Sequence, residues 1–222
     1  MKKENLVKFC KNILIKLNMD TEKACVTSAV LVEADMIGHS THGVRLLPNY
    51  VSDIEKGIMK VNGNYKIISE KKSNITIDGK LLPGIWLTRE GLKIGIEKAK
   101  DYGVSTVTIG NSHHNGALAA YLKNIVDEGF VAIIKSSVPS NSTVAPFGGT
   151  EPLFTPNPMA IGFPTNNLPV IIDISSSITT NNMIAEKIAN KQKFDFDCLL
   201  TPEGITSNDP LVVKDKGGTV LP

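Results

Sequence analysis

The feature that most constrains the fold is an alternation of helix-like and strand-like segments that begins after Pro83. Residues 87–103 space their apolar side chains as a helix does, and the β-branched run 104–110 follows directly. The same order returns in residues 117–129 and 130–137. Alternating segments of this kind build an α/β domain, in which ligands gather where a strand leads into the next helix. The sequence therefore predicts an α/β unit with a binding loop between the first strand and the second helix.

The residues before this region predict helices followed by a hairpin. Apolar residues recur at helical spacing in three segments, which we expect at 4–17, 21–38 and about 41–57. Thr21 is positioned to cap the second helix, and Ser40 or Thr41 to cap the third. Alternating apolar residues in 65–80 then indicate a β-hairpin.

The second half of the chain is richer in loops. Residues 138–158 hold too many prolines, glycines and asparagines for regular structure, and so long a loop is usually functional. Two apolar strands and a threonine-capped helix should follow, at 159–164, 169–175 and 179–192. The predicted fold class is therefore mixed α/β, with a helical N-terminal part over 1–80 that ends in the hairpin and an α/β part over 81–222.

Composition and charge exclude several classes of protein. The hydrophobic share of 41% and the charged share of 21% are those of an ordinary globular chain, not of a disordered or fibrous one. A net charge of +2, with both signs interleaved, provides no basic stripe for nucleic acid. No apolar run is long enough to span a bilayer, and the three cysteines form no CxxC pair. We expect a cytoplasmic protein without a nucleic-acid or membrane partner.

All four histidines lie in two glycine-flanked clusters, 38-GHSTHG-43 and 110-GNSHHNGA-117. A metal site is not favoured, because no acidic residue follows the first cluster at a ligand-like distance and the adjacent His113 and His114 point apart. A serine hydrolase is not supported either, because the sequence has no GxSxG nucleophile elbow. Acid–base chemistry remains, for which histidine is the usual side chain at neutral pH.

Each of these residues also has a purely structural interpretation. His42 or His114 could simply cap a helix or pack, and Arg45 could pair with a carboxylate or face solvent. Two histidine-bearing loops together favour function over packing alone. No GxGxxG follows a strand, so the usual dinucleotide fingerprint is absent. Composition and spacing thus indicate an α/β enzyme that uses histidine, without naming its reaction.

Four blocks of the sequence resemble, in order, the signature segments of the malate/L-lactate dehydrogenase family, whose NAD fold is not of the Rossmann type. The blocks are 38-GHSTHGVRLLPNYV-51, 111-NSHHNGALAAY-121, 144-VAPFGGTEPLFTPNPMAIGFP-164 and 173-DISSS-177. The resemblance extends as far as 203-EGITSNDP-210. It implies a non-Rossmann NAD-binding α/β domain, with the substrate and dimer side in 1–80 and the cofactor-binding part in 81–222.

The resemblance also implies a reaction and partners. Family members are cytoplasmic homodimers that transfer a hydride reversibly between NAD or NADP and a 2-hydroxy acid or its 2-keto partner. By position, His42 matches the histidine of a Ser-His-Gly block in which Thr41 replaces the serine, and His114 matches the histidine of a Ser-x-His-x-Gly block. Members differ in which histidine donates the proton. We favour His114 as the donor, with His42 and Thr41 orienting the substrate and Arg45 as the candidate for binding it.

The remaining matches concern the cofactor. Two of them form an Asn-Pro pair, and a further block matches the family's Asp-x-Ala-Thr-Ser with serines in place of alanine and threonine. The candidate cofactor-binding residues are His113, Asn157, Pro158, Asp173, Ser175, Ser176 and Ser177. No metal is implied.

Several positions depart from the family pattern. Leu46 stands where many members carry a substrate-binding arginine. Residues 155–156 read Thr-Pro in place of Gly-Thr, and residues 182–183 read Asn-Met in place of Gly-Lys. Members also continue beyond the Leu-Pro at 221–222, so the cofactor part is expected to be incomplete at its C-terminus. The alternative hypothesis is therefore a truncated or degenerate relative without catalysis, retaining at most dimerisation or nucleotide binding.

Overall fold

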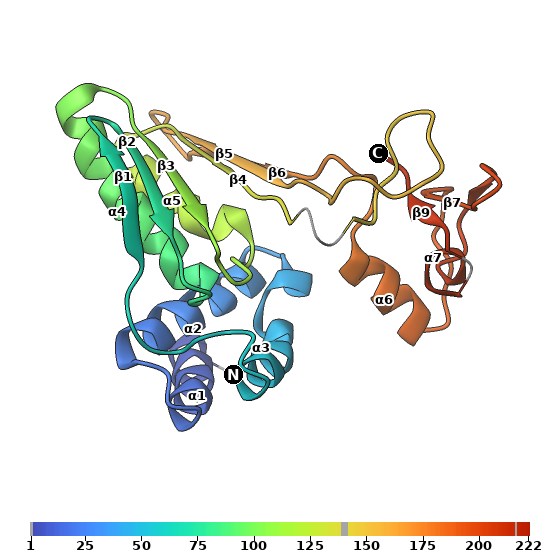
Figure 1. Cartoon of the computed structure of the whole chain (residues 1–222), viewed down its shortest axis with the longest axis horizontal. Helices are drawn as coiled ribbons and strands as arrows, with labels where there is room; N and C mark the ends of the chain where they lie inside the picture. Colours follow the sequence, from blue (N-terminus) through green and yellow to red (C-terminus); the bar gives the residue numbers. More distant parts are fainter. Residues whose placement is uncertain (1, 139–141, 216) are drawn as a thin grey trace. The chain divides into compact units, whose positions relative to one another are not determined.

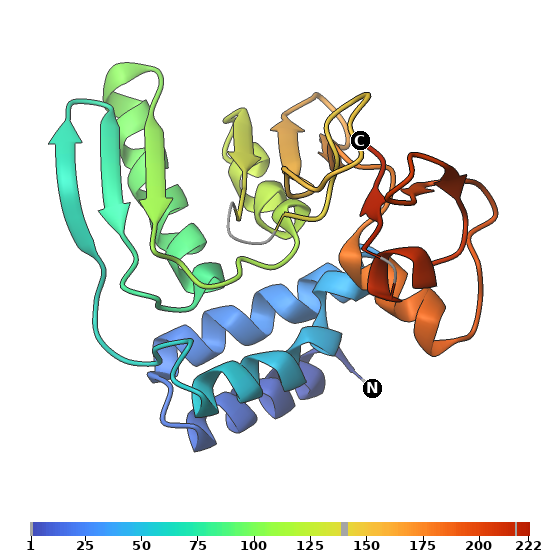
Figure 2. The ribbon, with the colours of Figure 1, turned by 45° about the vertical axis from the view of Figure 1, so that its right-hand side comes forward.

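The chain forms two compact units (Figures 1 and 2). The computed structural model describes residues 2–138, 142–215 and 217–222. Unit 1 comprises Met1–Val131 and Phe163–Pro169, and unit 2 comprises Ala132–Gly162 and Val170–Pro222. The chain therefore leaves unit 1 after Val131, returns to it for a short segment, and leaves it again after Pro169 to end in unit 2.

Unit 1 opens with three helices, as the apolar spacing predicts. They are α1 (Lys3–Lys16), α2 (Thr21–Met36) and α3 (Leu47–Glu55). α1 packs against α2 and buries Cys10 and Leu14. Past the end of α1, Asn18 takes a left-handed backbone with a φ of 61°, and past the end of α2, Gly38 has a φ of 91°. Such residues allow the chain to leave a helix sharply.

The predicted cap of α2 is wrong. α2 begins at Thr21 itself, so the capping position belongs to Asp20. The Asp20 side chain makes no capping hydrogen bond, because its carboxylate accepts a hydrogen bond from Lys23 Nζ at 2.6 Å instead. An ion pair within the first turn has thus replaced the cap.

The predicted cap of α3 is wrong as well. Ser40 and Thr41 lie in a 3-10 turn, η1 (Ser40–His42), and a second turn, η2 (Val44–Leu46), leads from it into α3. No side chain caps the start of α3. Pro48 stands in its first turn, where a residue without an N–H leaves one donor fewer to satisfy.

A three-stranded sheet follows the three helices in unit 1. The predicted hairpin is present as antiparallel β1 (Lys66–Lys71) and β2 (Asn74–Asp78), and β3 (Thr106–Gly110) pairs with β2 in parallel. The helix α4 (Gly84–Tyr102) makes the crossover that parallel strands require. It packs closely on β3 at Gly91, where a Cβ would lie 2.9 Å from Ile109 Cδ1.

The boundary of the compact units does not fall at residues 80 and 81, where the sequence suggested a division. Because β3 pairs with the hairpin strand β2, the segment 81–131 joins the N-terminal helices in unit 1. Which part of the chain binds substrate and which binds cofactor stays a prediction.

The second helix–strand repeat is only partly as predicted. Residues after β3 form a 3-10 turn, η3 (Leu118–Tyr121), and a short helix, α5 (Leu122–Asp127), followed by β4 (Ala132–Lys135). β4 does not extend the sheet of β3 but pairs antiparallel with β5 (Met159–Phe163). Apolar periodicity marks a strand without naming its partner, so the sequence could not reveal this change of sheet.

The described residues of unit 2 form two small sheets and two helices. One sheet has the order β4-β5-β6, with β6 at Val170–Ile174, and the other has the order β8-β7-β9, formed by Thr206–Ser207, Leu199–Leu200 and Thr219–Val220. The helices are α6 (Asn181–Ala189) and α7 (Leu211–Asp215). The predicted threonine cap of α6 is confirmed, since Thr180 Oγ1 accepts the Met183 N–H at 3.3 Å.

An apolar cluster forms the core of unit 2. Its buried members are Val144, Ile184, Phe194, Cys198, Leu199 and Val220. Val144 comes from the predicted loop 138–158 and forms isolated β-bridges to both Phe154 and Val220. The described part of this loop is thus tied to the core, while its residues 139–141 lie outside the described residues.

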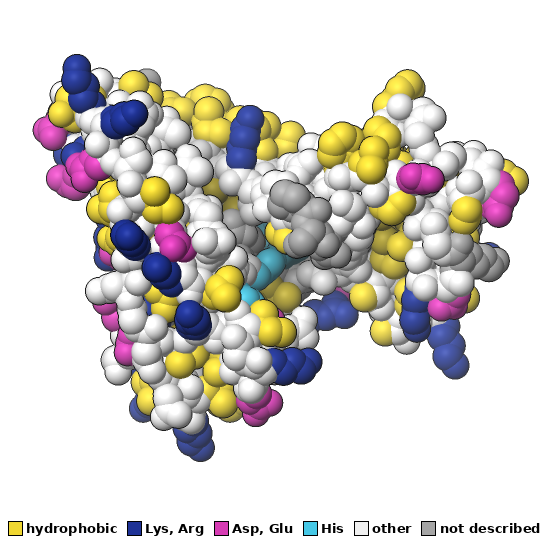
Figure 3. All heavy atoms as spheres, viewed as in Figure 1, with side chains coloured by type: hydrophobic (Ala, Val, Ile, Leu, Met, Phe, Trp, Pro, Cys, Tyr) yellow, Lys and Arg dark blue, Asp and Glu magenta, His cyan; other side chains and the backbone are white. Residues whose placement is uncertain are grey.

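The surface carries charges of both signs. Figure 3 shows lysine and arginine side chains interspersed with aspartate, glutamate and apolar groups on the face that it presents. On α4 such charges form exposed pairs, for example Lys100 with Glu97 at 2.8 Å. In the part of the chain that the structure describes, no helix is both long and apolar enough to cross a membrane.

Candidate active site

Three of the four histidines come together in unit 1. The rings of the loop residues His113 and His114 both contact Tyr50 on α3, and His42 from η1 stacks on His114; we call these four residues the histidine cluster. The rings of His42 and His114 lie nearly parallel, with centroids 5.8 Å apart and an interplanar angle of 19°. Part of the histidine surface is visible from outside in Figure 3. The two glycine-flanked clusters of the sequence thus form one site.

The turn that carries His42 is fixed against the end of α2. The Val44 N–H donates to Asp35 Oδ2 at 3.1 Å. Gly43 makes room for this carboxylate, since a Cβ at that position would lie 1.9 Å from Asp35 Oδ1. Thr41 Oγ1 lies 3.0 Å from His42 Nδ1. The predicted partner Thr41 therefore restrains the imidazole of His42.

The loop that carries His113 and His114 is held by backbone hydrogen bonds. The Leu81 N–H donates to the Asn111 carbonyl at 2.6 Å, and the His113 N–H donates to the Leu82 carbonyl at 3.1 Å. Gly84, the first residue of α4, lies directly against the loop, because a Cβ there would come within 1.9 Å of the His113 carbonyl oxygen. The position of the loop therefore depends on a residue without a side chain.

His114 is anchored at one edge of its ring. Its Nδ1 lies 2.9 Å from Tyr50 Oη and accepts the Gly116 N–H at 3.2 Å. The residue is nevertheless exposed to solvent, so the protein encloses the Nδ1 edge and leaves another part open. Burial of the ring, followed by the nearby charges of His42 and His113, lowers the pKa of His114 to about 4, although Asp53 acts in the opposite direction. His114 is therefore neutral at neutral pH.

His113 is turned toward α3. Its side chain is 10% exposed, and its Nε2 lies 3.0 Å from Asp53 Oδ2. Burial lowers the pKa of His113, while the hydrogen bond and charge of Asp53 oppose the shift. Its Nδ1 is buried with no hydrogen-bond partner among the described residues. Within unit 1 its partner is a carboxylate of α3, and its contact with a cofactor stays a prediction.

Arg45 lies in η2, three positions after His42, and its residue is exposed. The neighbouring Leu46, which occupies the position of the family's arginine, is buried in the apolar core. Leu46 therefore serves packing in this chain. The binding of a substrate carboxylate by Arg45 stays a prediction.

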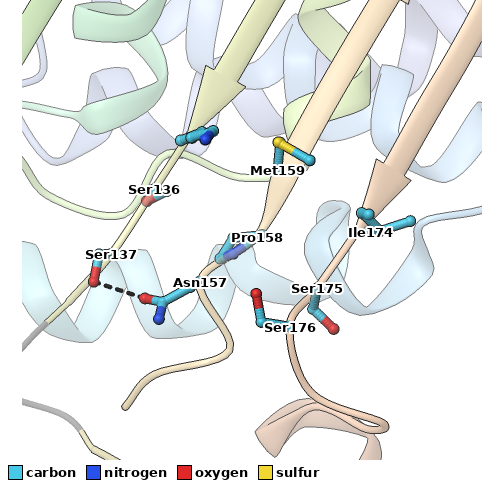
Figure 4. A pocket seen from close by; sticks show the side chains of 9 residues that line it. Ser136, Ser137, Asn157, Pro158, Met159, Ile174, Ser175 and Ser176 are labelled. Atoms are coloured by element: carbon cyan, nitrogen blue, oxygen red, sulfur yellow. Dashed lines mark hydrogen bonds between the residues drawn. The ribbon is translucent and has the colours of Figure 1, made fainter. Parts of the chain in front are cut away.

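Unit 2 contains a pocket of about 480 Å³ at the ends of three strands (Figure 4). β4 and β6 end at this pocket and β5 begins there, so three segments contribute short polar side chains. The lining residues are Lys135, Ser136, Ser137, Asn157, Pro158, Met159, Ile174, Ser175 and Ser176. Four of the predicted cofactor residues, Asn157, Pro158, Ser175 and Ser176, are thus brought together.

Asn157 organises one side of this pocket. Its Oδ1 accepts hydrogen bonds from Ser137 Oγ at 2.8 Å and from Thr155 Oγ1 at 2.7 Å. Figure 4 shows the first of these bonds and the side-chain nitrogen of Asn157 on the side away from Ser137. The backbone of Asn157 is left-handed, with a φ of 43°, which asparagine tolerates better than most residues. Strained backbone of this kind is frequent at ligand sites.

The other two predicted cofactor residues of unit 2 are not among the lining residues of this pocket. Asp173 lies within β6. Ser177 is buried, and its Oγ donates to the Thr179 carbonyl at 2.8 Å. Ser177 therefore stabilises the chain that follows β6, and contact of either residue with a cofactor stays a prediction.

A metal centre has no candidate ligand set in the described ranges, which contain no group of three or more histidine, cysteine, aspartate or glutamate side chains that could hold an ion. The nearest approach to one in the histidine cluster is the pair of His113 with Asp53. That pair is a hydrogen-bonded anchor between a loop and a helix.

Sequence reasoning missed Tyr50, Asp53 and the pocket residue Lys135. One signal could have indicated Tyr50. It lies on the apolar face of α3 with Leu47, and a hydroxyl on a buried face needs a hydrogen-bond partner. Asp53 and Lys135 carry no such signal, because charged residues at the end of a helix or strand are most often solvated.

Comparisons with known proteins agree with this architecture. The sequence model of the family described as Malate/L-lactate dehydrogenase matches residues 1–222. The malate/(S)-sulfolactate dehydrogenase of Methanothermus fervidus is 32% identical over 210 residues, which are 95% of this chain and 61% of that protein. The (2R)-3-sulfolactate dehydrogenase (NADP(+)) of Chromohalobacter salexigens is 30% identical over 178 residues, which are 74% of this chain and 50% of that protein.

A solved structure shows the same fold over the whole chain. The crystal structure of malate dehydrogenase from Entamoeba histolytica superposes with a TM-score of 0.94 at 27% identity, covering 100% of this chain and 63% of that one. The predicted mixed α/β fold class is thereby confirmed. The chain spans between 61% and 63% of the length of three curated relatives that match 95–100% of its residues.

Proposed function

Since the chain belongs to the malate/L-lactate dehydrogenase family, we propose that it transfers a hydride between a nicotinamide nucleotide and a 2-hydroxy acid or its 2-keto partner. The observation that carries the proposal is the pair of imidazoles, His42 and His114, with ring centroids 5.8 Å apart and with His114 exposed to solvent. Reduction of a carbonyl requires a hydrogen-bond donor for the charge that grows on oxygen and a source of one proton. Two neighbouring imidazoles can provide both.

The substrate of this class carries a carboxylate next to its reacting carbonyl. We assign the carboxylate to Arg45, because a guanidinium can hold both carboxylate oxygens at once and Arg45 is in the turn that follows His42. Thr41 holds the ring of His42 by its Nδ1. The names of the relatives specify malate and sulfolactate, which are both 2-hydroxy acids, and we propose a substrate of that class.

The pocket of unit 2 fits the polar parts of a nicotinamide nucleotide, either NAD or NADP. Four serine hydroxyls and the amide of Asn157 suit ribose hydroxyls and phosphate oxygens, and Lys135 adds a positive charge. The volume of about 480 Å³ lies within the roughly 300–1,000 Å³ of small-molecule sites. When bound, the nicotinamide ring supplies or accepts the hydride. We also propose that the protein is a homodimer, which follows from the family and can be measured by light scattering.

A second candidate function is nucleotide binding or dimerisation without catalysis. The Asn-Met at 182–183 favours it, because Met183 is 40% exposed in the first turn of α6 where the family pattern has a lysine. The other departure from the family pattern, Thr-Pro at 155–156, supports the first candidate, hydride transfer with a bound nucleotide. The Thr155 hydroxyl holds Asn157 Oδ1 at 2.7 Å, so the pocket makes use of this departure.

Two measurements on the purified chain separate the candidates. NADH or NADPH should raise the temperature of unfolding, because a ligand at about 100 times its Kd stabilises the folded state by about 2.7 kcal/mol. A shift of roughly 5–11 °C is expected for a chain of this size. A panel of 2-keto acids should then cause oxidation of the bound nucleotide. Protection without oxidation would support the second candidate, and absence of both would contradict either function.

A further inference from the structure

Tyr50 links α3 to the loop that carries His114. Its hydroxyl lies 2.9 Å from His114 Nδ1 and 3.4 Å from the carbonyl oxygen of the same residue. The Tyr50 side chain is 2% exposed. Burial, together with the charge of Asp53, raises the pKa of Tyr50 far above its ordinary value. Tyr50 therefore keeps its proton at neutral pH.

Two polar groups meet at His114 Nδ1. One is the Tyr50 hydroxyl, which can donate or accept according to the tautomer of the ring, and the other is the Gly116 N–H at 3.2 Å, which can only donate. A backbone N–H cannot accept a hydrogen bond, so Nδ1 must present its lone pair. A neutral imidazole with a lone pair on Nδ1 carries its proton on Nε2. A proton on Nδ1 would face the Gly116 N–H and would break that contact.

We propose that Tyr50 is a positioning residue which, with the Gly116 N–H, fixes His114 as a neutral imidazole with its proton on Nε2. This inference deepens the proposed function and takes its catalytic meaning from it. His114 then donates its Nε2–H as a hydrogen bond to the substrate's carbonyl oxygen and keeps that proton. The proton that completes the alcohol passes from protonated His42 to the oxygen, and His42 regains a proton from solvent. His114 thus changes from the predicted proton donor to a hydrogen-bond donor.

The charged and titratable groups around His114 support this division of roles. Its ring faces His42 from η1, His113 from its own loop, and Tyr50 and Asp53 from α3. The charges of His42 and His113 both disfavour a proton on His114, and Asp53 favours one. A proton on His42 therefore keeps its neighbour neutral, because two like charges in one small site disfavour each other.

The test is nitrogen-15 NMR of the histidine rings in the intact chain at pH 7. The chain has four histidines, so the His114→Gln variant identifies the signals of His114 by their loss. In the native chain we expect a protonated Nε2 and an unprotonated Nδ1. In Tyr50→Phe we expect a measurable fraction of the other tautomer and a higher pKa of the ring. The matched control is Tyr65→Phe. The ring of Tyr65 packs on Trp86, and removal of its hydroxyl should leave the His114 signals unchanged.

Several outcomes would overturn the proposal. They are a proton on His114 Nδ1 in the native chain, a doubly protonated ring at pH 7, or unchanged His114 signals in a folded Tyr50→Phe variant. If Tyr50→Phe does not fold, Tyr50→Leu takes its place, because it also removes the hydroxyl and keeps an apolar side chain at this buried position. In a chain that reduces 2-keto acids, Tyr50→Phe should lower kcat about tenfold with little change in KM. The loss is smaller than the 10²–10⁴-fold rate contribution that is typical of an acid–base group, because Tyr50 acts only through His114.

The inference and the proposed function fail in different ways. The expected tautomer in the native chain and its partial loss in Tyr50→Phe, in a chain that oxidises no nucleotide with any 2-keto acid, would support the role of Tyr50 and contradict the proposed reaction. Turnover by a chain with its His114 proton on Nδ1 would support the reaction and contradict the role of Tyr50.

Discussion

Replacement of Gly84 by alanine should displace the loop that carries His114. An added Cβ would lie 1.9 Å from the His113 carbonyl oxygen and 2.6 Å from that of His114. Both are backbone atoms, so no side-chain rotation relieves the contact. A separation of 3.4 Å is the lower limit of an ordinary Cβ contact, so the loop must move by roughly 1.5 Å relative to the start of α4.

The cost follows from what that movement breaks. Overpacking against backbone costs about 1–3 kcal/mol. The His113 N–H bond to the Leu82 carbonyl, 3.1 Å long, contributes about 1 kcal/mol more when it is lost. The higher helix propensity of alanine offsets up to about 1 kcal/mol of this loss of stability. Gly84→Ala should therefore destabilise the chain by about 1–4 kcal/mol and lower its Tm by roughly 2–16 °C.

Thermal or urea unfolding of the purified variant measures this effect, and Gly95→Ala is the matched control on the same helix. At Gly95 a Cβ would lie 3.3 Å from Ser105 Oγ, which needs to shift by only about 0.1 Å to reach 3.4 Å and can keep its hydrogen bond to the Gly95 carbonyl, so the stability should change by less than about 1 kcal/mol. The His114 ring signals should shift in Gly84→Ala and stay in place in Gly95→Ala. A Gly84→Ala variant as stable as the native chain, with unshifted His114 signals, would refute the packing argument.

Two further predictions concern acid stability and the pocket of unit 2. Burial lowers the folded-state pKa of both His113 and His114, so below about pH 6.5 the unfolded chain binds more protons and stability is lost as the pH falls. The urea midpoint should decrease from pH 7 toward pH 4.5, less steeply in His114→Gln, and a midpoint independent of pH would contradict the burial. Thr155→Val removes the 2.7 Å hydrogen bond to Asn157 Oδ1 and should weaken nucleotide binding about fivefold by calorimetry, at about 1 kcal/mol. Thr165→Val, in a different unit, should leave that affinity unchanged, and equal affinities of all three chains would contradict the role of Asn157.

The helices and the hairpin could be predicted from the sequence because their signals are local. The apolar spacing of α1 and α2 and the alternation in the hairpin depend on a few successive residues. The caps of α2 and α3 could not be predicted, because they depend on competing contacts. The carboxylate of Asp20 accepts a hydrogen bond from Lys23, and the turn before α3 depends on the close approach of Gly43 to the carboxylate of Asp35.

The sequence predicts that the two histidine-bearing loops are functional, but not which residues hold the histidines in place. The glycine-flanked motifs indicate the two loops, and the structure brings His42 and His114 together. Their anchors are distant in sequence, since Tyr50 precedes His114 by 64 residues and Asp53 precedes His113 by 60. Without a fold, nothing in the sequence states that α3 packs under this loop.

The sheets illustrate the same limit. Both β3 and β4 carry the β-branched pattern that the sequence offers, yet β3 joins the hairpin of unit 1 and β4 joins β5 in unit 2. The pattern records that one face of each strand is apolar, and the choice of partner depends on the packing of segments far apart in the chain.

The most direct test of the central claim compares the native chain with His114→Ala in the reduction of 2-keto acids by NADH or NADPH. The account predicts turnover by the native chain and a loss of about 10²-fold or more in kcat for the variant, since a hydrogen-bond donor to the developing oxyanion is removed. Nucleotide protection against thermal unfolding should be the same in both chains. Equal turnover by the variant would contradict the assignment of the histidine cluster as the active site.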